Sequence, residues 1–261
     1  MQSVARRIVD GQILKLVKSW LEAPVEEEDE KGRKQRSTPN RDTKRGTPQG
    51  APISPLLSNL YMRRFIVGWE RLGCQAKWAA QIVNYADDFV ICCKRGADDA
   101  MAAMRGIMEK LKLTVNEDKT HLCRIPQEHF DFLGYTFGRC YSRENGHAYT
   151  GTRPSKKSVK RMREAITQET DRRTTWLEDD EVVGRLNRKL IGWANYFSLG
   201  PVSPAYKQLH HHVTNRLRRW LCKKHKVRTT GVTRYPDQYL HETLGLVNLP
   251  KRTRSFPWAK A

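Results

Sequence analysis

The sequence QIVNYADDFVICC, residues 81–93, decides the fold of the first half of the chain. Residues 81–85 and 89–93 are short runs rich in Ile, Val, Tyr and Phe, which are enriched in β-strands. Only a few residues separate the two runs, so we predict two strands joined by a tight turn. Asp87 and Asp88 then lie at the tip of this hairpin.

Two adjacent carboxylates on a stiff β-ribbon are suited to binding hard divalent cations. Mg²⁺ prefers oxygen ligands, and carboxylates held in place can fix one or two ions against a phosphate. Asp87 and Asp88 therefore indicate phosphoryl transfer. The alternative is turn chemistry, because Asp is frequent in turns, where its side chain accepts hydrogen bonds from nearby backbone groups.

The composition indicates a polyanionic partner. The chain has 261 residues, enough for two modest domains, and 48 Lys and Arg against 28 Asp and Glu give a formal net charge of +20. Residues 1–150 carry 24 basic and 19 acidic side chains, whereas residues 151–261 carry 24 and 9. The 7 Trp, 9 Tyr and 7 Phe can stack on unpaired bases, a combination suited to RNA. A membrane surface would attract the same charge, so sequence motifs are needed to distinguish RNA from a membrane as the partner.

The cysteines and histidines show no metal-binding pattern. The six cysteines form no C-x-x-C pair and have no matching His spacing, which argues against a zinc site and favours reduced thiols in a cytosol. Consecutive helical residues point in different directions, so the His210-His211-His212 run is better explained as a polar helix face. No apolar run approaches the roughly 20 residues that span a bilayer. We expect a cytoplasmic protein that does not bind membranes.

The order of apolar, turn and capping residues predicts an α+β first half. Ser54 and Pro55 are suited to a helix start, and apolar residues at helical spacing follow Asp98 and Asp99. The patterns predict a helix over 4–21, a solvated loop or hairpin tip over 26–45, helices after Ser54 and around 98–111, a strand near 113–115, and a hairpin from residues 130–137 and 148–150.

After Gly151 the hydrophobic period becomes helical, which predicts an all-helical second domain over residues 152–261. Three helices are expected, the third beginning at Ser203-Pro204. Basic residues on the first and third helices could follow an RNA backbone, although a solvated helix face is the alternative. The candidates are Lys156, Lys157, Lys160, Arg161, Arg216, Arg218, Arg219, Lys223 and Lys224.

Several motifs in a fixed order resemble the reverse transcriptase and maturase proteins encoded by group II introns. One Tyr-Ala-Asp-Asp tetrapeptide is weak evidence, but the ordered set covers nearly the whole chain. The set consists of Gly46-Thr47-Pro48-Gln49-Gly50 with Ile53-Ser54-Pro55, Tyr85-Ala86-Asp87-Asp88, Leu113 through Lys119-Thr120, Phe132-Leu133-Gly134-Tyr135, Leu186-Asn187 through Phe197, and Leu244-Gly245-Leu246.

The resemblance implies a role for each motif. Asp87 and Asp88 would bind the two Mg²⁺ ions of a polymerase palm, and Lys119 would protonate the leaving pyrophosphate, with an ordinary surface lysine as the alternative. Pro48, Gln49 and Gly50 would contact the incoming deoxynucleotide and the template. Phe132, Leu133, Gly134 and Tyr135 would grip the primer end, or simply form a hairpin core. The helical half would be the thumb, or maturase domain, that binds intron RNA.

One departure from the family pattern is important. Family members carry the template-binding fingers and another metal-binding Asp on a strand that precedes the helix corresponding to residues 4–21, and this sequence begins after them. Asp10 lies in the helical segment, so we do not accept it as the replacement. We therefore expect residues 1–151 to form a partial palm and the chain to be a C-terminal piece, with the missing segment lost or supplied by a separate polypeptide.

Two hypotheses follow from these observations. In the first, the chain is a reverse transcriptase of a mobile element, which acts as a nucleotidyltransferase on an RNA template and DNA primer once the missing segment is supplied. In the second, the chain is a polymerase-inactive RNA-binding maturase fragment that assists splicing. The intact Asp pair favours the first hypothesis, and the missing strand favours the second. A nuclease built on the same pair lacks any further acidic or His cluster.

Overall fold

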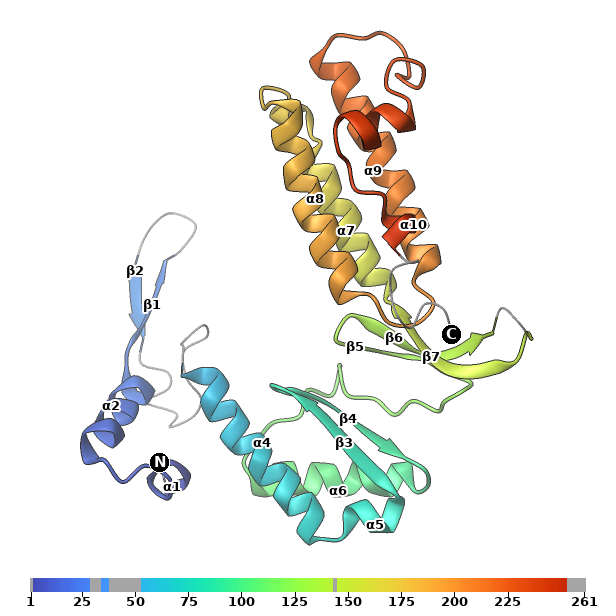
Figure 1. The fold of residues 1–261 in the computed structure, drawn as a ribbon. Helices are drawn as coiled ribbons and strands as arrows, with labels where there is room; N and C mark the ends of the chain where they lie inside the picture. The colour runs from blue at the N-terminus through green and yellow to red at the C-terminus, as the bar shows by residue number, and fades with distance from the viewer. Residues whose placement is uncertain (1, 29–33, 38–52, 143–144, 253–261) are drawn as a thin grey trace. The chain divides into compact units, whose positions relative to one another are not determined.

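The computed structural model describes residues 2–28, 34–37, 53–142 and 145–252, and the chain divides into two compact units (Figure 1). The first unit extends to Leu122 and the second begins at Cys123. Helices and small antiparallel sheets occur in the chain, which agrees with the predicted α+β class.

The N-terminal segment contains two helices where the sequence predicted one. Helix α1 spans Gln2–Ala5 and α2 spans Gly11–Glu22. Asp10 separates them, because its side chain accepts hydrogen bonds from the backbone N–H groups of Gln12 (2.7 Å) and Ile13 (3.3 Å) and so caps the start of α2. Asp10 therefore lies outside the helices, although the sequence pattern placed it within one, and its exclusion as a metal ligand stays a prediction. Strands β1 (Val25–Glu28) and β2 (Lys34–Ser37) then pair antiparallel.

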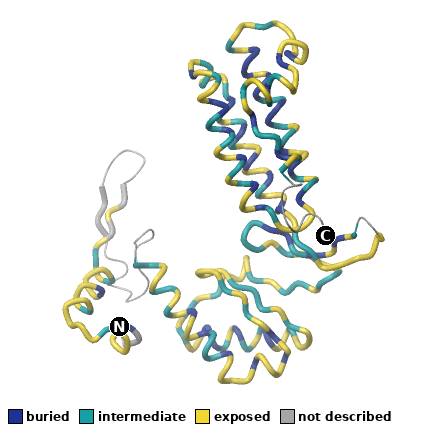
Figure 2. The backbone as a smooth tube through the Cα atoms, viewed as in Figure 1, coloured by how far each residue is buried: buried dark blue, intermediate teal, exposed yellow. Residues whose placement is uncertain are grey.

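The core of the first unit lies between a β-hairpin and three helices. The helices are α4 (Ser54–Arg71), α5 (Cys74–Trp78) and α6 (Ala97–Lys110), and the hairpin consists of β3 (Ala80–Tyr85) and β4 (Asp88–Cys93). Phe65, Trp69 and Met104 are fully buried in this core. Figure 2 shows the buried stretches of the backbone in dark blue. Alternate residues of β3 face this core, as expected for a strand with one buried face.

The strand predicted near residues 113–115 is not formed. A strand needs a partner, and the sheet of β3 and β4 contains only these two strands among the described residues. The backbone N–H of Leu113 instead donates to the carbonyl of Met108 (2.9 Å) at the end of α6. Leu113 and Val115 pack against the apolar core of the first unit, which explains their apolar character without a strand.

The second unit opens with a three-stranded antiparallel sheet. Its strands are β5 (Phe130–Phe132), β6 (Tyr135–Tyr141) and β7 (Ala148–Pro154), with β6 in the centre. Phe130 pairs with Phe137, and the two rings stack with centroids 5.3 Å apart. Since this sheet belongs to the same compact unit as the helices that follow, the units divide earlier than the change of hydrophobic period after Gly151.

Helices α7 (Lys156–Glu169), α8 (Asp179–Tyr196) and α9 (Ser203–Lys224) form the bundle of the second unit (Figure 1). Ser155 caps α7, because its hydroxyl accepts a hydrogen bond from the N–H of Ser158 (3.1 Å). Ile166, Leu186 and Leu217 are among the core side chains that are completely buried. The shorter elements are η1 (Arg172–Thr174), η2 (Tyr239–Thr243) and α10 (Leu249–Arg252).

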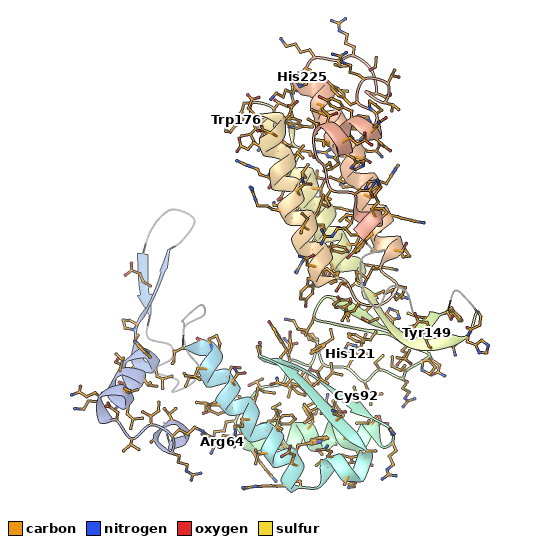
Figure 3. The ribbon with its side chains drawn as sticks, in the orientation of Figure 1. Arg64, Cys92, His121, Tyr149, Trp176 and His225 are labelled. Atoms are coloured by element: carbon orange, nitrogen blue, oxygen red, sulfur yellow. The ribbon has the colours of Figure 1, made fainter. Side chains whose placement is uncertain are left out.

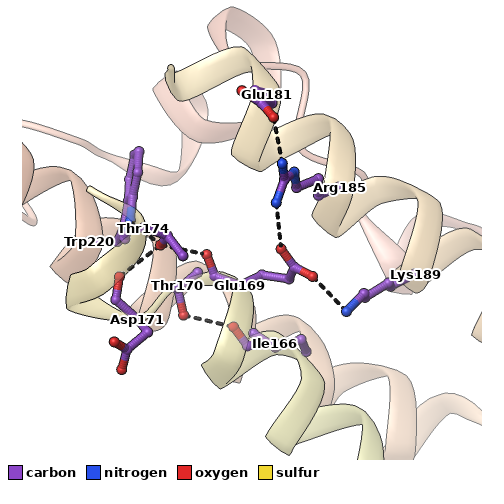
Figure 4. A network of polar contacts seen from close by, with 9 residues as sticks. All are labelled: Ile166, Glu169, Thr170, Asp171, Thr174, Glu181, Arg185, Lys189 and Trp220. Atoms are coloured by element: carbon purple, nitrogen blue, oxygen red, sulfur yellow. Dashed lines mark hydrogen bonds and ion pairs between the residues drawn. The ribbon is translucent and has the colours of Figure 1, made fainter. Parts of the chain in front are cut away.

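A network of polar contacts fixes the end of α7 against α8 and α9 (Figure 4). The carboxylate of Glu169 is 2.6 Å from the Lys189 ammonium and 4.0 Å from the Arg185 guanidinium. The Glu169 side chain is only 16% exposed, so this pairing is less screened than a surface ion pair. The indole N–H of Trp220 donates to the hydroxyl of Thr174 (3.0 Å), which joins η1 to α9.

Asn187 connects two of the sequence motifs. Its amide N–H donates to the carbonyl of Gly245 (2.8 Å), and its side-chain oxygen accepts from the N–H of Val247 (2.8 Å). The imidazole of His241 contacts the carbonyl of Leu246 at 2.7 Å in the same segment. Residues near the end of the described chain are therefore held against α8 by backbone hydrogen bonds.

The described helices include none that is both long and apolar enough to cross a membrane. All six cysteines are free thiols, as the sequence predicted. The run His210-His211-His212 lies within α9, and the described residues contain no group of three or more His, Cys, Asp or Glu that could hold a metal ion.

One histidine of this run has an unusual environment. The ring of His210 stacks on that of His241, with centroids 5.0 Å apart and planes 13° from parallel. Burial, together with the neighbouring His241, lowers the pKa of His210, while Asp237 acts weakly in the opposite direction. The unfolded chain, with a His pKa of about 6.5, then binds more protons than the native protein as the pH falls below neutrality.

We therefore expect the second unit to lose stability as the pH falls from 7 to 5, and His210→Phe to reduce that loss. Phe keeps the ring stack but cannot be protonated. The midpoint of thermal unfolding, measured at both pH values, checks this expectation. His211→Phe is the matched control, since His211 is exposed on the same helix. An unchanged pH dependence in His210→Phe would show that this ring does not control it.

Candidate active site and nucleic-acid interface

The hairpin places both aspartates at its tip, as predicted. Tyr85 pairs with Asp88, so Ala86 and Asp87 form a two-residue turn. Ala86 has a φ of 53°, a left-handed conformation that costs energy for a residue with a Cβ. The side-chain amide of Asn84 donates to the carbonyls of Ala86 (2.9 Å) and Asp88 (3.3 Å), which holds the turn in this shape. Sequence reasoning missed this role of Asn84.

The two aspartates lie beside an exposed face of the hairpin. Residues that pair across an antiparallel ribbon share a face, so Asp88 lies on the same face as Tyr85 and Val83. Tyr85 is 64% exposed and Val83 49% exposed, whereas the opposite face packs on the core of the first unit. Asp87 and Asp88 are themselves exposed. An ion or a phosphate can therefore reach both carboxylates.

The chemistry of these two residues fits a divalent cation in part. Carboxylate oxygens are the ligands that Mg²⁺ prefers, and the hydrogen bonds of Asn84 keep the turn from rearranging. Two residues supply only part of the shell that two ions need. No third carboxylate, His or Cys joins them among the residues that the structure describes.

The structure says less about the other residues predicted to act in polymerisation. Lys119 is exposed in a turn after α6, where its N–H donates to the backbone carbonyl of Asn116 (3.2 Å). Pro48, Gln49 and Gly50 lie outside the described residues.

The predicted primer-grip motif forms the tight turn between β5 and β6. Leu133 and Gly134 both have positive φ values, 50° and 79°. The hydroxyl of Tyr135 donates to the carbonyl of Tyr196 (2.5 Å), and the hydroxyl of Tyr196 donates to the carbonyl of Leu133 (2.9 Å). The carbonyl of Gly134 accepts from the hydroxyl of Ser158 (2.8 Å) and from the backbone N–H of Ser155 (2.9 Å).

These hydrogen bonds hold the turn against the helical bundle. Tyr135 is buried and packs on Phe197, with ring centroids 5.0 Å apart, while Phe132 and Leu133 stay half-buried. The structure therefore gives Tyr135 a packing role. Sequence reasoning did not assign a role to Tyr196, although the aromatic run at the end of α8 was a signal that this end is packed against another element.

The basic residues predicted on α7 are on its surface. Lys156, Lys157, Lys160 and Arg161 are all exposed, and among the described residues their one acidic ion-pair partner is Glu164, 3.9 Å from Lys160. Such an exposed, distant pair contributes little to stability. These four side chains are free to contact a phosphate backbone.

The basic residues predicted on α9 differ in their surroundings. Arg218 is 7% exposed and donates to the carbonyl of Tyr235 (2.9 Å) and to Asp237 (2.5 Å). Arg216 donates to Thr167 and Thr170, and Lys224 donates to the carbonyl of Leu177 (2.5 Å). Only Arg219 and Lys223 of the predicted α9 set are exposed. Of the five, Arg218 is buried and Arg216 and Lys224 are half-buried, because these three bind carbonyls and side chains of other segments. That the set binds RNA stays a prediction.

Comparison with known families agrees with this geometry. Residues 2–137 match the reverse transcriptase (RNA-dependent DNA polymerase) family, and residues 159–236 match the group II intron, maturase-specific domain. The chain belongs to the group II intron reverse transcriptase/maturase family. It is also 32% identical to Protein YkfC of Escherichia coli (strain K12), over 43% of this chain and 38% of that protein. The match thus spans about two fifths of that relative's length. The domain boundary that we predicted at residue 151 stays a prediction.

We expect Gly134→Ala to destabilise the second unit by about 2–4 kcal/mol. A Cβ there would lie 2.9 Å from the Ser158 hydroxyl and 3.0 Å from the Phe197 ring, in a backbone conformation that disfavours a side chain. Gly184→Ala is the control, because nothing lies within 4 Å of its Cβ and Ala favours the helix by roughly 0.5–1 kcal/mol. Denaturant unfolding measures both. Equal stability of the two variants would contradict the tight docking of the turn.

Arg218→Ala should cost about 2 kcal/mol of stability, because it leaves the Tyr235 carbonyl without its donor and removes a buried side chain. Arg219→Ala should change stability by less than about 0.5 kcal/mol, since the Arg219 side chain is exposed. The two substitutions remove the same charge from adjacent positions, and thermal unfolding compares them. If Arg218→Ala leaves the midpoint of thermal unfolding unchanged, the contacts of Arg218 do not stabilise the fold.

Proposed function

We propose that this chain acts as a group II intron reverse transcriptase/maturase, which copies RNA into DNA and binds intron RNA for splicing and mobility. The observation that carries the proposal is the exposed Asp87-Asp88 pair on a braced hairpin turn, in a chain of this family. The RNA template, the DNA primer and deoxynucleotides are the expected substrates. A cytoplasmic location, where thiols stay reduced, suits the six free cysteines.

In this proposal Asp87 and Asp88 hold two Mg²⁺ ions. When bound, such ions neutralise the charge of the phosphates and favour ionisation of the attacking hydroxyl. The chain's own contribution is positional: Asn84 fixes the turn, and the hairpin core keeps both carboxylates at its tip. Lys119, an exposed ammonium in the same unit, is proposed to donate a proton to pyrophosphate.

The second unit is proposed to contact nucleic acid in two ways. The turn Phe132–Tyr135 is held on the bundle by the tyrosine hydrogen bonds, which suits it to positioning a primer end. The exposed basic residues of α7, with Arg219 and Lys223 of α9, are proposed to bind intron RNA through its phosphates.

We further propose that another segment completes the metal site. The outer edges of a two-stranded sheet leave backbone groups that can pair with an added strand, and β3 and β4 form such a sheet in the described structure. A strand added there could bring a third carboxylate to the hairpin tip. We propose that such a strand supplies the carboxylate that the hairpin tip lacks among the described residues.

The second candidate function is that of a polymerase-inactive maturase fragment. The incomplete set of carboxylates among the described residues favours it, because two-metal catalysis needs ligands that bridge both ions. The second unit has a well-packed core of its own and exposed basic residues, so RNA binding does not depend on the metal site.

Primer extension on an RNA template tests these candidates. We expect the purified chain alone to synthesise no DNA from Mg²⁺ and deoxynucleotides, because two carboxylates do not place both metal ions correctly. Each contribution of a correctly placed ion is worth several kcal/mol, which corresponds to several orders of magnitude in rate. Adding the N-terminal segment of a related family member should restore synthesis if the two pieces assemble.

The control is Asp87→Asn in the same mixture, which should abolish the restored synthesis while leaving RNA binding intact. Robust extension by the chain alone, lost in Asp87→Asn, would contradict the proposed need for another segment. Assembly without any extension would favour the maturase fragment.

A further inference from the structure

A groove of about 280 Å³ runs between α7 and the start of α9 in the second unit. One side is basic: Arg153 at the end of β7 is followed by Lys156, Lys160 and Arg163, which lie on one stripe of α7 at spacings of four and three. The other side is neutral and contains Pro201, Pro204, Ala205 and Gln208. Pro154 and Val159 complete the lining, which contains no acidic residue.

The cations of this groove are available to a ligand. Arg153, Lys156 and Arg163 are exposed, and no side-chain ion pair to them occurs among the residues that the structure describes. Lys160 has only the distant contact with Glu164. By contrast, Arg216, Arg218 and Lys224 on α9 are used by intramolecular contacts. Part of the excess charge of the second half is therefore accessible in the groove.

We propose that this groove binds an unpaired segment of RNA, with its phosphates on the α7 side and its sugars and bases against the prolyl side. The proposal rests on the proposed RNA-binding function and specifies the form of RNA and the residues. A duplex offers phosphates but keeps its bases stacked and paired inside, so it could use only the basic side. An unpaired strand can use both sides.

The dimensions of the groove set the expected number of contacts. Lys156 and Arg163 are seven residues apart on α7, which corresponds to about 10 Å along the helix axis. A stacked strand carries one phosphate per about 3.4 Å, so the stripe spans roughly three phosphates. Each phosphate contact to a single strand contributes about −0.7 to the slope of log affinity against log salt. The groove should therefore account for a slope of about −2.

Sequence reasoning named Lys156 and Lys160 but missed Arg153 and Arg163. Arg163 is three residues after Lys160, so helical spacing alone could have added it to the stripe. Lys157 and Arg161 are four residues apart, as Lys156 and Lys160 are, and they are exposed but do not line the groove. The α7 helix thus carries two pairs of cations, each four residues apart, of which only one pair lines the groove.

This arrangement supplies a matched experiment with the full chain. The double variant Lys156→Gln/Lys160→Gln removes two groove cations, and the control Arg172→Gln/Arg173→Gln removes the same charge from two exposed positions outside the groove. Fluorescence anisotropy measures the affinity of each for an unpaired oligoribonucleotide of about twelve residues and for the duplex of the same sequence. Circular dichroism melting confirms that both variants remain folded, which their exposed positions predict.

The groove variant should bind the unpaired strand about twentyfold more weakly than wild type at 0.1 M salt, with a slope reduced by about 1.4, since two phosphate contacts are lost. The control should lose less than about threefold. Ala205→Glu, on the neutral side, should also weaken binding, because it places a carboxylate opposite the phosphates at a position where Glu suits a helix start.

The outcomes separate this proposal from the proposed function. Equal losses in the two double variants would leave RNA binding intact as a function but would overturn the groove as its site. Duplex binding as tight as single-strand binding, with the same sensitivity to Ala205→Glu, would overturn the assignment to unpaired RNA. Absence of RNA binding by the wild-type chain would overturn both the proposed function and this inference.

Discussion

The docking of one tight turn onto the helical bundle is the constraint on which the second unit depends. Leu133 and Gly134 both adopt positive φ values, and hydrogen bonds from Tyr196, Ser155 and Ser158 satisfy their carbonyls. Because the donors come from α7 and α8, the turn can keep its shape only while these helices are packed. The β5–β7 sheet and the bundle consequently form one compact unit, although their hydrophobic periods differ.

Burial also explains which polar groups remain free for function. The hydroxyl of Tyr206 donates to the carbonyls of Ala194 and Phe197, and its burial raises its pKa to about 12, so it stays a donor at any physiological pH. Arg218 is likewise used inside the fold. All five cations of α7, by contrast, are left in solvent. The charge of a helix in the sequence is therefore a poor guide to its binding surface until the internal partners are known. Figure 3 shows the described side chains on the ribbon.

Local pattern predicted the elements well and long-range pairing poorly. The β3–β4 hairpin, α6 and the bundle helices follow from periodicity and caps that a few neighbouring residues define, such as Ser155 before α7. The strand expected at residues 113–115 was wrong, because a strand requires a partner that no local pattern reveals. The same limit applies to Arg218, whose partners lie 17 and 19 residues away, and to Tyr196, which contacts a turn 63 residues earlier.

The most direct test of this account is native-state hydrogen exchange of the full chain, because it reports which segments open together. We expect the N–H of Ser155, which donates to the Gly134 carbonyl, to exchange with the same free energy of opening as core amides of α7 and α8, and Tyr196→Phe to lower that free energy selectively at the turn. Exchange of the β5–β7 amides independently of the bundle, unaffected by Tyr196→Phe, would contradict the claim that the turn and the helices form one unit.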